Sequence, residues 1–92
     1  MDAPYVLVTT TYRGVFYGQL VEEKGADSIV LKDCRNVMSW EGKRGFLGLA
    51  SHGPEEGSVL GSTASKVWLY SITAVAKCTP EAEEAAREWE GA

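Results

Sequence analysis

The sequence is poor in the residues from which metal centres and disulfide frameworks are built. Its 92 residues include two cysteines, Cys34 and Cys78, and one histidine, His52. These three side chains leave a tetrahedral zinc site one ligand short, and no Cys-x-x-Cys pair is present. In a reducing compartment we expect the two distant cysteines to be small buried hydrophobes and not a disulfide. We therefore expect no metal and no cofactor.

Long apolar runs and a secretory leader are also missing. The longest uninterrupted apolar runs, such as residues 67–70, are too short to span a bilayer. The first residues have neither a basic n-region nor an apolar h-region. We expect a protein that acts in the cytoplasm and has no membrane partner.

Motifs that carry catalysis are absent as well. The glycines form neither a Walker loop nor a dinucleotide-binding fingerprint. Ser51 and His52 are adjacent, so they do not face each other on a helix, and no glycine elbow surrounds Ser51. We therefore expect a protein that is not an enzyme.

Acidic residues exceed basic ones, but only at the end of the chain. The net charge is −4, and residues 80–92 alone hold five acids against Arg87. Residues 1–79 hold eight acids and eight bases, of which four bases and two acids lie in residues 32–44. A balanced body with one locally positive segment suits one or a few phosphates, whereas duplex nucleic acid requires a strongly basic face. A duplex partner is disfavoured.

The sequence does contain a succession of β-strand patterns. Residues 5–12, 15–23 and 28–40 have the β-branched and aromatic composition of strands, with a parity change near Asp33 that predicts a bend. A short helix is expected at about residues 44–52, where the apolar spacing changes and Gly53 and Pro54 then end it. Beyond it we expect a weak strand, a single 3₁₀ turn and a last strand, at residues 58–63, 64–66 and 67–77 respectively.

The end of the chain has the clearest helix signals. Thr79 suits the N-cap, Pro80 suits the first helical position, and a narrow alanine stripe ends in Trp89. A helix this short is marginal in water, so it must dock on its own domain or on a second subunit, with Trp89 as the interface anchor.

These elements predict one mainly β domain over residues 1–92. We expect a five-stranded SH3-like or Sm-like barrel over residues 4–78, with the helical insertion at about 44–52 and a C-terminal helix at 80–90. The sequence has no internal repeat and no linker.

Four segments carry a resemblance that spans most of the chain: YRGVFYG (12–18), DCRNVMSWEG (33–42), FLGLASHG (46–53) and ITAVAKCTPEA (72–82). In these segments the chain resembles a family of small, uncharacterised proteins encoded in tailed-bacteriophage genomes. The family has no assigned reaction, so the resemblance implies a phage context and no mechanism.

The most informative pattern is a tryptophan between arginines. Trp40 lies between Arg35 and Arg44, and an aromatic ring beside guanidinium groups suits a planar anion such as a nucleotide. Tyr12 and Arg13, at the first predicted turn, are further candidates for the same ligand site.

A second interpretation of these residues is structural. Trp40 then closes one end of the barrel, and the arginines pair with Asp33 and Glu41 at the surface. In a chain this small, aromatic rings are needed for burial.

Two functions stay open. In the first, a homo-oligomeric phage protein sequesters a small anionic ligand, such as a nucleotide immune signal, and thereby acts against host defence. In the second, the protein is a homo-oligomeric interaction or structural module that binds a phage or host protein through Trp40. A third function, single-stranded nucleic-acid binding, is opposed by the acidic balance.

Overall fold

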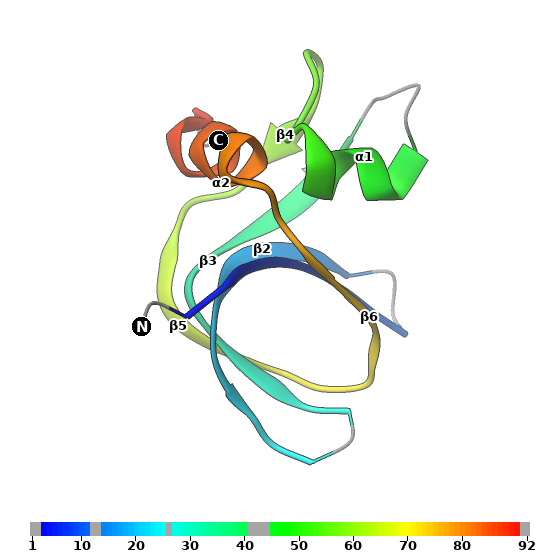
Figure 1. The fold of residues 1–92 in the computed structure, drawn as a ribbon, viewed down its shortest axis with the longest axis vertical. Helices are drawn as coiled ribbons and strands as arrows, with labels where there is room; N and C mark the ends of the chain where they lie inside the picture. Colours follow the sequence, from blue (N-terminus) through cyan, green and yellow to red (C-terminus); the bar gives the residue numbers. More distant parts are fainter. Residues whose placement is uncertain (1–2, 12–13, 26, 41–44, 91–92) are drawn as a thin grey trace.

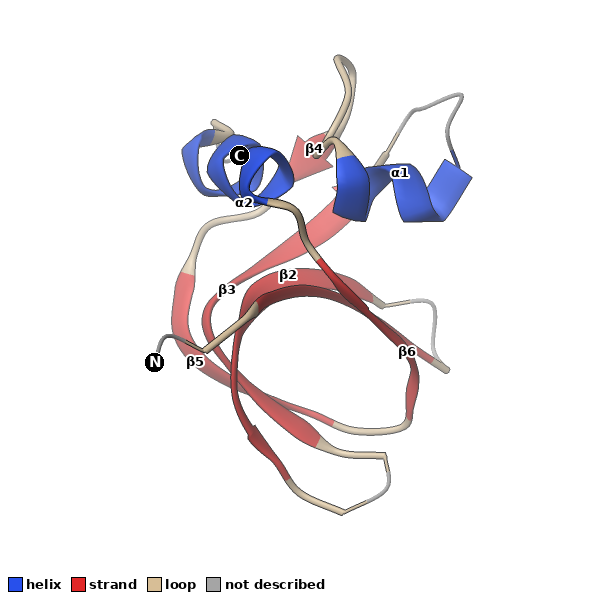
Figure 2. Cartoon of the chain, in the orientation of Figure 1, coloured by secondary structure: helices blue, strands red, loops and turns tan. Residues whose placement is uncertain are grey.

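The chain folds into an antiparallel sheet of six strands with two helices at one end of it (Figures 1 and 2). The computed structural model describes residues 3–11, 14–25, 27–40 and 45–90. In chain order the elements are β1 (Tyr5–Thr10), β2 (Val15–Glu23), β3 (Ile29–Ser39), α1 (Gly45–Ser51), β4 (Val59–Leu60), β5 (Ala64–Leu69), β6 (Ile72–Lys77) and α2 (Pro80–Glu88). The mainly β class, the inserted helix and the C-terminal helix are thus confirmed. Within these described ranges neither helix has the length and apolar content needed to cross a membrane.

The long strand β3 organises the sheet because it pairs with three other strands. β2 pairs with β3 along one side. On the other side β5 pairs with the first part of β3, and β4 pairs with its last part. Between these two parts Asp33 has a φ of 53°, a left-handed conformation that aspartate tolerates better than most residues. The predicted bend near Asp33 is confirmed, and it lets one strand pair with two partners on the same side.

The predicted five-stranded barrel is wrong, because the sheet has six strands and its pairing does not close. Figure 1 shows the curl of the sheet. The strand order is β4-β3-β2-β1-β6 with β5 beside β3, and no ladder joins β5 to β6 within the described residues. The expected single strand at residues 67–77 is divided before β6, where Ser71 has a φ of 58°. This division produces the sixth strand and carries the chain from the β3 side of the sheet to the β1 side. The expected 3₁₀ turn at residues 64–66 is instead the first part of β5.

Alternation along β1 divides the interior into two apolar clusters. Tyr5 and Leu7 point to the cluster beneath the helices, and Val6 and Val8 point to the cluster inside the curl of the sheet. Tyr17, on β2, joins the first cluster, where its hydroxyl donates to the Leu49 carbonyl oxygen at 2.7 Å. Both faces of the central strands are therefore covered, which explains why both are apolar in the sequence.

A buried arginine attaches helix α2 to the sheet. Arg35, on β3, is only 3% exposed. Its Nε donates to the Gly61 carbonyl oxygen at 2.8 Å, and its Nη1 donates to the carbonyl oxygens of Ala86, at 2.8 Å, and of Trp89. Carbonyls at a helix C-terminus lack intrahelical donors and carry the negative end of the helix dipole. The guanidinium supplies both the donors and the positive charge.

The two ends of α2 have further contacts with the same domain. The Thr79 hydroxyl accepts from the Ala82 amide at 3.1 Å and donates to the Ser51 carbonyl oxygen at 2.7 Å, which confirms the predicted N-cap. Trp89 is half-buried against the cluster beneath the helices, and its Nε1 donates to the Ser58 carbonyl oxygen at 3.1 Å. Of the two docking partners predicted for this helix, the structure shows its own domain.

We predict that Arg35→Met lowers the free energy of unfolding by about 3 kcal/mol or more, because each buried carbonyl that loses its donor costs about 1–3 kcal/mol. Urea denaturation monitored by circular dichroism measures the loss. Arg87→Met is the matched control. The Arg87 side chain is 35% exposed, and its ion pairs with Glu83 and Asp33 are worth about 0–1 kcal/mol each. Methionine can still cover the Tyr5 ring, so we expect a smaller loss. Equal stability of the two variants would contradict the role assigned to Arg35.

The two cysteines provide a prediction about pH. Both are free and buried. Burial raises the pKa of Cys34 to about 11, and burial together with the negative charge of Glu83 raises that of Cys78 to about 12. In the unfolded chain thiols ionise near pH 8.5, so their contribution to stability is complete below about pH 8.5 and is lost as the pH rises towards 11 and 12.

Two measurements check this expectation. At pH 8 the native protein should react with iodoacetamide far more slowly than the protein in urea. The free energy of unfolding should also fall between pH 8 and pH 10. Alkylation of the native protein at the rate of the unfolded chain would show that the thiols are not protected.

Candidate functional site

The described structure does not assemble the predicted arginine–tryptophan cluster on one surface. Arg35 lies beneath α2 with its guanidinium on peptide carbonyls, and not at the surface where the sequence pattern puts it. Trp40 follows the end of β3 and is 37% exposed. Tyr12, Arg13 and Arg44 lie outside the described residues. Arg35 is buried there because the carbonyls at the C-terminus of α2 need hydrogen-bond donors, and a cation also complements the negative end of the helix dipole.

The adjacent Ser51 and His52 do not form a catalytic pair. The Ser51 hydroxyl donates to the Leu47 carbonyl oxygen at 2.9 Å, whereas His52 Nδ1 lies 3.5 Å from a carboxylate oxygen of Glu81. The two side chains therefore have separate partners. Among the residues described, no three histidine, cysteine, aspartate or glutamate side chains gather in a way that holds a metal ion.

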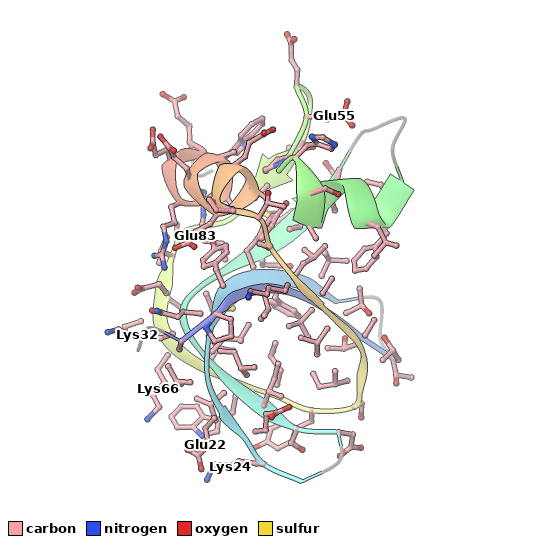
Figure 3. All side chains as sticks on the ribbon, viewed as in Figure 1. Glu22, Lys24, Lys32, Glu55, Lys66 and Glu83 are labelled. Carbon is pink, nitrogen blue, oxygen red and sulfur yellow. The ribbon has the colours of Figure 1, made fainter. Side chains whose placement is uncertain are left out.

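A different surface, on the outside of β3 and β5, has the features of an anion site. It is an open groove of about 430 Å³ lined by Val21, Lys32, Ser65 and Lys66, which we call the lysine groove. Lys32 and Lys66 lie directly opposite each other in the β3–β5 ladder. Figure 3 shows both at the flank of the sheet, below helix α2. Side chains paired in this way have Cβ atoms about 5 Å apart, so a single small anion can reach both ammonium groups.

Among the described residues, no carboxylate pairs with the lysines of the lysine groove. Within the described part of the chain neither Lys32 nor Lys66 forms an ion pair, whereas the nearby Lys24 lies 3.2 Å from a carboxylate oxygen of Glu22. Like charges directly opposite each other destabilise a sheet. The lysine groove thus holds two cations whose mutual repulsion an anion would relieve.

An exposed indole lies beside these cations. Trp68 is 50% exposed, and its ring centroid is 5.3 Å from Lys66 Nζ. Val30, the residue opposite Trp68 in the β3–β5 ladder, is 1% exposed, so the indole lies on a packed surface. Tyr70 directly follows β5 and is 66% exposed. The lysine groove therefore continues into aromatic surface.

Sequence reasoning missed this site for an identifiable reason. Lys32 belongs to the basic segment 32–44, but Lys66 falls in the expected 3₁₀ turn, and Trp68 falls in an apolar run. The sequence does place Lys66, Trp68 and Tyr70 at every second position, a spacing that is typical of a strand with one exposed face. The opposition of the two lysines depends on the register between strands, and local sequence does not encode it.

Comparison with known proteins identifies a family and no function. No curated protein and no solved structure matches the chain. A model of a domain of unknown function, DUF6948, matches residues 3–86, which span all six strands and most of α2. The chain therefore belongs to the DUF6948 family.

Proposed function

We propose that this protein is a non-enzymatic module that binds a small phosphate-bearing ligand in the lysine groove. The observation that carries the proposal is the pair of opposed lysines, Lys32 and Lys66, which lack a carboxylate partner among the described residues. A phosphate between them would replace the repulsion of the two ammonium groups by two charge-assisted hydrogen bonds. The groove volume of about 430 Å³ lies within the range of small-ligand sites.

This proposal keeps the ligand class that the sequence suggests and moves its position. Arg35 is committed to α2, so the positive charge comes from β3 and β5 instead. In the phage context that the sequence resemblance implies, such a module would sequester a nucleotide signal in the cytoplasm of the infected cell. Sequestration requires affinity and no catalytic group.

A homo-oligomeric interaction module is the second candidate. The observation in its favour is the exposure of Trp68 and Tyr70, because tryptophan and tyrosine are enriched in protein interfaces. Light scattering together with ligand binding separates the two functions: an oligomer that returns to the monomer mass in Trp68→Ala, with no stabilisation by phosphate compounds, would favour the interaction module.

We predict that pyrophosphate and adenosine monophosphate raise the melting temperature of the protein. A ligand at 100 times its dissociation constant adds about 2.7 kcal/mol to the free energy of unfolding. The shift should disappear in the double variant Lys32→Gln, Lys66→Gln. It should persist in Lys77→Gln, which removes an exposed lysine outside the lysine groove.

Two results would overturn the proposal. One is the absence of a shift with either phosphate compound. The other is a shift that survives the double variant, in which case Trp40→Ala and Arg44→Gln would locate the ligand at the arginine–tryptophan segment.

Removing one lysine should also change the stability of the free protein. We expect Lys32→Gln to raise the free energy of unfolding by about 0.2–1 kcal/mol without ligand, because like charges directly opposite each other are unfavourable by about this amount. Among the described residues Lys32, unlike Lys66, has no cation–π contact to lose. Urea denaturation at low salt measures the change, and the same measurement in 0.5 M sodium chloride should reduce it by screening. A loss of stability at low salt would indicate that Lys32 has a structural role.

A further inference from the structure

We propose that the ligand of the lysine groove is a short single-stranded oligonucleotide, of which two or three nucleotides lie along β5. The acidic balance that opposes nucleic-acid binding comes from residues 80–92, whereas the strands that form the groove belong to the charge-balanced residues 1–79. This inference rests on the proposed function for its phosphate contacts and extends the site from the lysines to the neighbouring aromatic rings. It follows from the order in which cationic and aromatic side chains appear on the outer face of β5.

Lys66 and Trp68 are at alternate positions of β5, and the exposed Tyr70 directly follows the strand. Val67 and Leu69, between them, pack into the cluster inside the curl, so Lys66 and Trp68 face outward. Alternate residues of a strand are about 6.5–7 Å apart. A stretched single strand separates successive bases by roughly twice the ~3.4 Å rise of a duplex strand, which is the same interval. A phosphate at Lys32 and Lys66, one base on Trp68 and the next on Tyr70 therefore match the spacing of the protein.

The contact between Lys66 and Trp68 is compatible with this arrangement. Lys66 Nζ lies 5.3 Å from the indole centroid, so in the free protein the ammonium group covers part of the ring. A lysine side chain is flexible enough to turn from the ring to a phosphate. Base stacking on an indole is stronger than an exposed cation–π contact, so exchanging one for the other favours the bound state.

The surrounding charges limit the length of the site. Glu22, across β3 from Trp68, is paired with Lys24, so it does not confront the ligand as a free anion. Beyond Tyr70 the chain meets Asp27, whose carbonyl oxygen accepts from the Ile72 amide at 3.0 Å and which is exposed. A further phosphate in that direction approaches a carboxylate. The site therefore accommodates a short strand and does not extend to a long polyanion.

Calorimetric titration with thymidine monophosphate and with oligothymidylates of two, three, four and eight nucleotides tests the proposal. We expect the affinity to rise from one to three nucleotides and then to level off. Trp68→Ala should weaken the binding of the trinucleotide by about 5-fold to 150-fold, the range for loss of one stacked base. Tyr70→Ala should weaken the trinucleotide and leave the mononucleotide unchanged.

Matched variants and salt separate the contributions. Trp40→Ala is the control for Trp68→Ala, since Trp40 is an exposed tryptophan outside the lysine groove. Trp68→Phe retains an aromatic ring and should restore most of the affinity if stacking is the cause. Because one phosphate is neutralised, the logarithm of the binding constant should fall with the logarithm of salt concentration with a slope near −0.7, and the double variant Lys32→Gln, Lys66→Gln should abolish this dependence.

The outcomes distinguish this inference from the proposed function. If pyrophosphate, thymidine monophosphate and all oligomers bind equally and Tyr70→Ala changes nothing, the oligonucleotide inference is wrong and the phosphate site stands. If no phosphate compound binds, both are wrong. Affinity that continues to rise to eight nucleotides, or that is lost in Trp40→Ala, would also overturn the arrangement along β5.

Discussion

The contact between Arg35 and the end of α2 is the interaction on which the arrangement of this domain depends. Arg35 lies on β3 close to the point where that strand leaves β5 and meets β4, and its guanidinium reaches both Gly61 and the last turn of the helix. A nine-residue helix is not stable by itself in water. The buried cation fixes it against the sheet, and the cluster containing Tyr5 and Leu7 is closed as a result.

The free-energy cost of burying the Arg35 charge is offset by peptide carbonyls, and no carboxylate among the described residues pairs with it. Peptide carbonyls at a helix C-terminus combine hydrogen-bond acceptors with the negative end of the dipole, so they replace both the water and the counterion that a guanidinium loses on burial. The opposite holds for Lys32 and Lys66, which are exposed and opposed on the outer face of the sheet. One cation stabilises the fold, and the other two lie exposed without an ion-pair partner among the described residues. The sequence pattern alone predicts the reverse, with Arg35 at the ligand site and no such role for Lys32 and Lys66.

How far the fold follows from the sequence can be seen element by element. The signals at Thr79 and Pro80 are local, so the start of α2 follows from adjacent residues. The bend at Asp33 follows from the change of apolar parity in β3. The open sheet does not follow, because the break before β6 depends on a positive φ at Ser71, and serine adopts that conformation only when long-range pairing favours it. For the candidate site, the spacing of Lys66, Trp68 and Tyr70 can be seen in the sequence, but the opposition of Lys66 to Lys32 cannot.

The sequence by itself determines the mainly β class, both helices, the burial of the cysteines and the concentration of acidic charge in α2, because each of these follows from composition or from neighbours along the chain. Only the tertiary structure decides that Arg35 is internal, that Trp89 anchors α2 on its own domain and that two lysines face each other across strands. The physical reason is the same in all three cases. Each contact joins residues more than twenty-five positions apart, and the energy of such a contact depends on strand register and helix placement that no local pattern records.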